Sequence, residues 1–352
     1  MKIFTQPILL LAVFAALFAQ PAHAQDPRFS QFYNAPAQLN PAMTGVFNGK
    51  ARVVANYRDQ WGSFLSPNPF RTYAVSADMR LPVGRTDNFA LGVSALHDEA
   101  GTSQYVQNRA NLGLSFIKQL SGGRRTADHF LSAGAQLGVG QNSMDWGSLW
   151  FSNQFNSSTE LPDPTLNSGE PTQDGSTGAF LDFNAGLLWY ALFENEGFMY
   201  AGGALHHLNQ PKFSFLGDGS QSLATRWAGH FGGQFPLSYN FYLQPGLQFM
   251  RQSTALEVNP GLNVRYTNHD RDELALRAGV WGRIGNKLDK GLQMDALTFL
   301  GMIEINRWAV GLSYDVTVST LTRANNSRGA FEVSLIYIHP GDRRMRVQCP
   351  DF

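Results

Sequence analysis

Histidines beside carboxylates are the first residues of this chain whose types suit catalysis or metal binding. His97-Asp98-Glu99 and His206-His207 each lie where we expect a strand to end. Neighbouring side chains of a strand point to opposite faces, so His206 and His207 cannot share one metal ion unless the strand bulges. We therefore interpret both groups as polar rim residues and predict no catalytic residue, no metal site and no cofactor. An enzyme site assembled from several strands stays an alternative.

The single cysteine and the balanced charge exclude further kinds of site. Cys349 is the only cysteine, so no disulfide forms within the chain and no metal site is built from several thiolates. We interpret it as a free thiol, with pairing to a partner as the alternative. The 27 basic and 27 acidic residues give a formal net charge of zero. Without a basic patch that carries stacking aromatic side chains, nucleic-acid binding is set aside.

The elements that would position such residues are strands. From Leu256 to Tyr266, apolar side chains or proline at even positions alternate with polar residues or glycine, such as Glu257 and Asn263, at odd positions. This alternation gives a strand one apolar and one polar face. The same pattern predicts about fourteen strands, at residues 50–58, 70–81, 88–97, 103–118, 127–141, 178–192, 197–208, 222–236, 239–250, 254–267, 272–284, 291–304, 307–318 and 328–338.

Strand length favours a membrane barrel over a soluble sheet. Many of the predicted strands are about 11 to 16 residues long, whereas strands of soluble sheets are nearer 5–6 residues and a bilayer requires about 9–11. In hydrocarbon an open sheet edge is not tolerated, so the strands must close on themselves. We predict an all-β fold, a transmembrane antiparallel β-barrel over residues 49–338. A secreted β-sandwich or propeller is the alternative.

The two ends of the chain lack the alternating pattern of the predicted barrel strands. The apolar run from Ile8 to Phe18, followed by Ala22-His23-Ala24, predicts a signal peptide over residues 1–24. Residues 25–48 are rich in proline and predict an irregular leader that plugs the lumen or contacts a periplasmic partner. Residues 339–352 are expected to form a periplasmic tail. Both termini would then be periplasmic, and the long connection 142–177 would lie outside.

Distinctive motifs run from the leader to the last residue. The segments are Asp26-Pro27-Arg28-Phe29-Ser30-Gln31-Phe32-Tyr33, Pro36, Leu39-Asn40-Pro41-Ala42, Gly45, Tyr57-Arg58-Asp59-Gln60-Trp61, Gly311-Leu312-Ser313-Tyr314-Asp315, Ser319, Gly329, Glu332, Tyr337 and Cys349-Pro350-Asp351-Phe352. Together they resemble the PorP/SprF family, the barrel components of the type IX secretion system. The family's ending more often reads Cys-Pro-Arg-Phe, so Asp351 departs from it.

The resemblance implies a non-enzymatic outer-membrane component of type IX secretion and gliding machinery. Its partners would be outer-membrane lipid, a secreted surface protein or adhesin, and other secretion components, including a periplasmic peptidoglycan-binding subunit. A passive channel or ligand transporter is the alternative function. The residues we expect to contact a partner are Asp26, Pro27, Phe29, Gln31, Phe32, Tyr33, Asn40, Pro41, Tyr57, Arg58, Gln60, Trp61, Arg343, Arg344, Arg346 and Cys349.

Overall fold

The structure is a computed structural model of the chain. It describes residues 26–66, 68–84, 86–123, 126–163, 165–169, 175–215, 221–268, 274–287, 291–341 and 349–350. The predicted signal peptide lies outside these residues, and so do Arg343, Arg344 and Arg346 of the tail.

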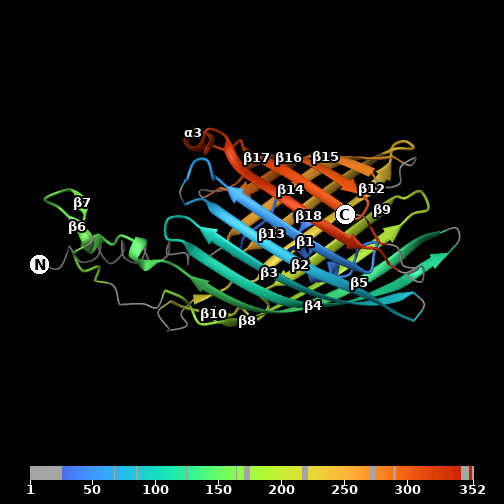
Figure 1. The fold of residues 1–352 in the computed structure, drawn as a ribbon, viewed down its shortest axis with the longest axis horizontal. Helices are drawn as coiled ribbons and strands as arrows, with labels where there is room; N and C mark the ends of the chain where they lie inside the picture. Colours follow the sequence, from blue (N-terminus) through green and yellow to red (C-terminus); the bar gives the residue numbers. More distant parts are fainter. Residues whose placement is uncertain are drawn as a thin grey trace, which may run out of the picture.

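Fourteen antiparallel strands form one closed barrel, as the alternation predicts, and they cross the barrel at a tilt to its long axis (Figure 1). Each strand pairs with its neighbours in the chain, and β1 pairs with β18 to close the wall. The barrel strands are β1 (Ala51–Gln60), β2 (Phe70–Val83), β3 (Asp87–Ala100), β4 (Tyr105–Gly123), β5 (Thr126–Ser143), β8 (Phe180–Leu192), β9 (Phe198–His206), β12 (Arg226–Pro236), β13 (Phe241–Gln252), β14 (Ala255–Thr267), β15 (Leu274–Asn286), β16 (Leu292–Ile305), β17 (Trp308–Thr317) and β18 (Arg328–His339).

The two faces of the wall differ as the alternation requires. On β14, Glu257, Asn259 and Asn263 point inward and are buried, whereas Leu262 and Val264 point outward and are 42% and 38% exposed. Large outward side chains recur around the barrel, among them Trp227, Phe231 and Trp308. An apolar outer surface around a closed hydrogen-bonded wall suits a bilayer. Among the described residues, no helix has the length and apolar composition needed to cross a membrane.

The two mouths of the barrel carry connections of different length. At one mouth, here called the loop-side mouth, the longest connection joins β5 to β8, and its described residues 144–163 extend away from the wall (Figure 1). This connection contains the short strands β6 (Phe155–Asn156) and β7 (Leu161–Pro162), which the sequence does not predict. At the opposite, tail-side mouth, β18 ends, and the connections 237–240 and 306–307 are short. The long connections therefore gather at one mouth.

The leader, residues 26–48, passes through the lumen from one mouth to the other. At the loop-side mouth, the Asp26 amide donates to Gln252 at the end of β13. At the tail-side mouth, Asn48 and Cys349 exchange two hydrogen bonds of 2.7 Å. Asp26 and Cys349 therefore lie at opposite mouths of the barrel.

Short turns give the leader its compact path. Three helical segments follow one another, η1 (Phe32–Asn34), α2 (Pro36–Leu39) and η2 (Pro41–Met43). Pro36 and Pro41 start the second and third, where a missing N–H costs no hydrogen bond. The Asn40 side chain accepts from the Ala42 amide and so caps η2. Proline thus shapes the leader as a chain of single turns.

Candidate functional site

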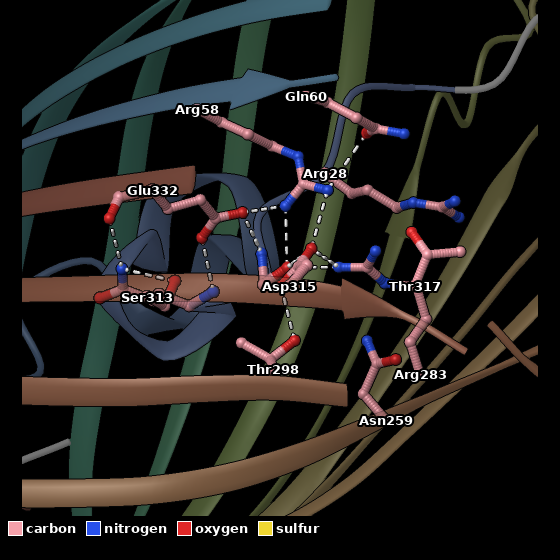
Figure 2. Close-up of polar contacts among 12 residues, drawn as sticks. Arg28, Arg58, Gln60, Asn259, Arg283, Thr298, Ser313, Asp315, Thr317 and Glu332 are labelled. Carbon is pink, nitrogen blue, oxygen red and sulfur yellow. Dashed lines mark hydrogen bonds and ion pairs between the residues drawn. The ribbon is translucent and has the colours of Figure 1, made fainter. Parts of the chain in front are cut away.

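The interface between the leader and the lumenal wall is the candidate functional site, and four charged wall residues lie at its centre. This central cluster comprises Arg58 of β1, Arg283 of β15, Asp315 of β17 and Glu332 of β18 (Figure 2). Asp315 accepts from Arg58 at 3.1 Å, from Arg283 at 2.7 Å and from Thr298 at 2.6 Å. Arg58 also pairs with Glu332, its register partner across the strand pair that closes the barrel.

The central cluster binds the backbone of the leader directly. Both carboxylate oxygens of Glu332 accept leader amides, from Ser30 at 2.6 Å and from Gln31 at 2.9 Å. The Ser30 hydroxyl donates to Asp315 at 2.8 Å. Glu332 therefore connects the leader to the wall through charge-assisted hydrogen bonds, which are the stronger kind.

Charge within the central cluster balances. Two guanidiniums face two carboxylates, and no side chain of the four is more than 9% exposed. A third pair, Arg28 of the leader with Glu257 of β14, lies beside them. Buried charges are costly unless each is paired and hydrogen-bonded. Loss of any one member leaves an uncompensated charge inside the wall.

A second group, the loop-side cluster, holds the first described residue of the leader. Asp26 contacts Arg109 at 2.8 Å, His207 at 2.6 Å and Arg226 at 3.2 Å. The other ring nitrogen of His207 lies 2.9 Å from Asp182. Both imidazole nitrogens are therefore engaged by carboxylates, which leaves neither available to act as a base on a substrate.

The structure corrects the expectation for the two adjacent histidines. His206 and His207 were expected on opposite faces at the rim, but both are buried, with exposed fractions of 3% and 2%. His207 adopts a left-handed backbone conformation, with φ at 58°, immediately after β9 ends. That conformation breaks the strand alternation and allows both rings to face the lumen.

Between these clusters, polar side chains of the wall satisfy the leader's irregular backbone. The hydroxyls of Ser132 and Ser115 donate to the carbonyls of Ala42 at 2.7 Å and Thr44 at 2.6 Å. Unpaired backbone groups are costly at membrane depth, so irregular chain is tolerated there only with such partners. Further donors to leader carbonyls are Gln136 to Ala37, Arg226 to Gln38, Arg52 to Met43 and Asn56 to Asn34.

Small and large residues of the wall shape the space that the leader fills. Trp281 of β15 points inward, and its ring centroid lies 5.1 Å from Phe32 and 5.6 Å from Tyr33. A Cβ on Gly261 would overlap the Trp281 ring, and one on Gly134 would overlap the Pro41 carbonyl. Glycine at these two positions is required by close approach, because any side chain would displace an aromatic ring or the leader.

At the tail-side mouth, the end of the described chain packs beneath the leader. Cys349 is 3% exposed, and an Arg80 guanidinium nitrogen lies 2.9 Å from its sulfur. The Tyr190 hydroxyl lies 3.6 Å from the same sulfur, and the Tyr190 ring stacks on Phe130. Cys349 and the two hydrogen bonds of Asn48 thus fix the point where the leader turns into β1.

The expected partner-contact residues separate into buried and peripheral sets. Most leader residues of the set face the wall and are buried, namely Phe29, Gln31, Phe32, Tyr33, Asn40 and Pro41. Arg58 of the wall and Cys349 are buried as well. Tyr57 instead points outward beside Tyr73, with ring centroids 5.1 Å apart. Trp61 lies just beyond β1 and packs edge-on against Phe70. The structure brings Arg58 and Gln60 together through a 3.1 Å hydrogen bond.

Sequence reasoning named Arg58 of the wall but missed the other charged wall residues that hold the leader. None of Arg109, Asp182, His207, Arg226, Glu257, Arg283, Asp315 and Glu332 was named as a site residue. Their signal was present, because each barrel-strand member occupies an inward position of an alternating strand. A charge at an inward position requires a partner inside the lumen. Which charged residues pair with one another, and with the leader, depends on how the barrel closes, and the sequence alone does not show this.

The described residues offer no arrangement suited to metal binding or to a nucleophile. No group of three or more His, Cys, Asp or Glu side chains among them is placed to hold a metal ion. The Asp182–His207–Asp26 contact has no Ser, Thr or Cys beside a free imidazole nitrogen, which nucleophilic catalysis needs. The chemistry of the described site is therefore retention of the leader by ion pairs and hydrogen bonds.

The chain is similar to one protein family and to several solved structures. The model of the family described as type IX secretion system membrane protein PorP/SprF matches residues 22–337. No curated protein matches the chain. Similar solved structures include CdiB from Acinetobacter baumannii, at 8% identity and a TM-score of 0.45, covering 82% of this chain and 60% of that one. They also include a TodX monoaromatic hydrocarbon channel mutant, at 13% identity and a TM-score of 0.44, covering 86% of this chain and 92% of that one. A third is the translocator domain of the autotransporter NalP from Neisseria meningitidis, at 11% identity and a TM-score of 0.39, covering 95% of this chain and 98% of that one.

Proposed function

The chain belongs to the PorP/SprF family of type IX secretion system membrane proteins, and from this premise we propose that it acts as a non-enzymatic adaptor in the outer membrane. The adaptor binds or anchors a secreted surface protein, or docks a periplasmic subunit of the secretion machinery. Its closed barrel with an apolar outer surface is the fold of an outer-membrane protein.

The occupied lumen is the observation that carries the proposal. The leader spans the lumen between the two mouths and is held at both ends and at its centre by wall residues. A passive channel needs a continuous aqueous path, which a leader fixed by buried ion pairs opposes. An adaptor needs only a rigid body in the membrane with surfaces at each mouth. The channel therefore remains the second candidate.

We place the loop-side mouth outside the cell and the tail-side mouth in the periplasm. Outer connections of outer-membrane barrels are generally the longer ones, and the longest connection here lies at the loop-side mouth. This connection presents Trp150 and Phe155, which are 55% and 54% exposed. Exposed aromatic side chains are enriched at protein interfaces. They support contact with a secreted surface protein on this side.

Affinity purification of the tagged protein from its native envelope tests the adaptor. The expected result is co-purification of a secretion component or a surface protein, and loss of the surface protein when Trp150 and Phe155 are both replaced by alanine. Leu321→Ala is the matched control, because Leu321 is 48% exposed in another loop-side connection. Purification of the barrel with neither class of protein would overturn the adaptor.

Conductance in planar bilayers separates the adaptor from the channel. The intact protein is expected to stay closed, because the leader occupies its lumen. The double replacement Arg58→Gln and Glu332→Gln removes one buried pair while keeping the lumenal charge balanced, and it should produce intermittent openings. Steady conductance of the intact protein would favour the channel.

A further inference from the structure

A pocket opens at the tail-side mouth between the leader and the wall. Its volume of 310 Å³ lies within the range of ligand sites, about 300–1,000 Å³. One side is the leader, with Tyr33 and Phe47. The other side comes from β14 to β17 and the 306–307 turn, and it supplies Arg265, Arg277, Glu304 and Arg307. We call this space the tail-side pocket.

Positive charge exceeds negative charge among the described residues that line the pocket. Glu304 is one carboxylate shared by two guanidiniums, from Arg265 at 2.8 Å and Arg277 at 2.9 Å. Arg307 is exposed at the turn between β16 and β17. A fourth lining guanidinium, that of Arg52, is matched by Asp78 at 2.7 Å.

Arg277 carries a donor that the described structure leaves unused. Its side chain is only 3% exposed, and its Nε is buried without a hydrogen-bond partner. A buried guanidinium N–H without an acceptor is costly, so such a group marks a place where an acceptor is expected. A carboxylate matches a guanidinium in both geometry and charge.

We propose that the tail-side pocket binds an acidic peptide segment, with a carboxylate of that segment beside Arg277 and Arg307. The apolar side chains of Phe47 and Met302 line the same pocket and receive a neighbouring apolar residue. A polypeptide fits better than a lipid headgroup, because the pocket lies on the lumenal side of a closed wall. The proposal rests on the adaptor function and names the chemistry of its periplasmic partner.

An occupant of the pocket also touches the leader. Tyr33 belongs to the buried aromatic group around Trp281. The Arg52 guanidinium lies over the Phe47 ring, with its Cζ atom 4.7 Å from the ring centroid. Binding at the tail-side mouth thus acts on the same segment that the central cluster holds. The pocket joins a partner on one side of the membrane to the element that crosses the lumen.

Peptide binding to the full-length protein in detergent micelles tests the proposal. The probe is a fluorescein-labelled pentapeptide with two glutamates around a leucine, and its comparison peptide carries glutamines instead. At about 0.15 M salt, where exposed charges are largely screened beyond about 8 Å, the acidic peptide should bind about tenfold more tightly than the glutamine peptide. Arg307→Gln should weaken binding of the acidic peptide about three- to tenfold, as expected for one lost charged contact.

Arg251→Gln is the matched control, because Arg251 is an exposed arginine of β13 near the loop-side mouth. Equal affinity of the two peptides, equal effects of the two arginine replacements, or absence of binding at about 1 mM peptide, the weak end of specific affinities, would overturn the pocket. The heat-dependent gel mobility of a folded barrel confirms that each variant is intact. Failure here leaves the envelope purification unaffected, so the pocket and the adaptor are judged separately.

Discussion

Replacing Glu332 by glutamine should release the leader without unfolding the barrel. The intact central cluster pairs two guanidiniums with two carboxylates, and Glu332→Gln leaves Arg58 and Arg283 sharing Asp315, with Glu257 at 3.9 Å from Arg283 as a second carboxylate nearby. The Arg58–Glu332 pair lies within the wall, so its loss weakens the barrel whether or not the leader is bound. The leader itself loses the charged acceptor of its Ser30 and Gln31 amides, and each hydrogen bond to a charged group contributes about 1.5–3 kcal/mol. Glutamine keeps one oxygen acceptor, so we count the loss of one such bond, at about 3 kcal/mol, which corresponds to about a hundredfold larger population of released leader.

Hydrogen exchange measures that population at amides that Glu332 does not contact. The Asn34 and Ala35 amides donate to the Gln31 and Phe32 carbonyls at 2.9 Å and 3.1 Å, within the leader itself. Their exchange should accelerate about a hundredfold, and more than exchange in the barrel strands. Local opening of this kind is what exchange detects below global unfolding.

Two further variants sharpen this test. Arg71→Gln is the control, because Arg71 is 41% exposed and lies 3.6 Å from Asp59, and such surface pairs contribute about 0–1 kcal/mol. Replacing Arg58 and Glu332 together by methionine keeps the charge balanced but removes every side-chain oxygen that accepts the Ser30 and Gln31 amides, so it should release the leader at least as much as Glu332→Gln alone. Unchanged exchange at Asn34 and Ala35 in Glu332→Gln would refute the reasoning, as would an equal change in Arg71→Gln.

Three other outcomes follow from the lumenal contacts. Asp26→Asn leaves two arginines of the loop-side cluster without their shared carboxylate, and limited proteolysis should then cut the start of the leader faster than its end. Gly261→Ala places a methyl group into the Trp281 ring and should lower the melting temperature by a destabilisation of about 1–3 kcal/mol, whereas Gly301→Ala meets open space and should have no effect. The buried Cys349 thiol should react with maleimide slowly in the folded protein and rapidly after denaturation, and equally fast reaction in both states would contradict its burial.

Much of the barrel was predictable because its physics is local. In an alternating strand such as β14, eleven residues are enough to show which face is apolar and which is polar. All fourteen barrel strands lie within a few residues of their predicted positions. Hairpins held by few contacts, such as β6 with β7, leave no comparable pattern. The inward direction of the His207 side chain was also not predicted, because a single residue in the left-handed conformation breaks the rule that adjacent strand residues point to opposite faces.

The candidate site was predictable on the leader and, apart from Arg58, not on the wall. Proline, asparagine and aromatic residues between Asp26 and Asn48 identified an unusual segment, and its motif carried the family resemblance. The partners of that segment come from strands far apart in the chain, such as β1, β15 and β18. Only the closed register, in which Arg58 stands opposite Glu332, brings them together. Inward charges indicate that partners are needed inside the lumen, and closure of the barrel determines which partners they meet.

The position of the Arg58–Glu332 pair has a consequence for biogenesis. These residues are opposite each other on the first and last barrel strands, so their pairing is complete only when the nascent sheet closes into a cylinder. Glu332 also accepts two amides that only the leader supplies. Circularisation and leader insertion are thus energetically coupled. A barrel closed without its leader would retain a carboxylate with unfilled acceptor sites, which gives an assembly factor a chemical difference between finished and unfinished protein.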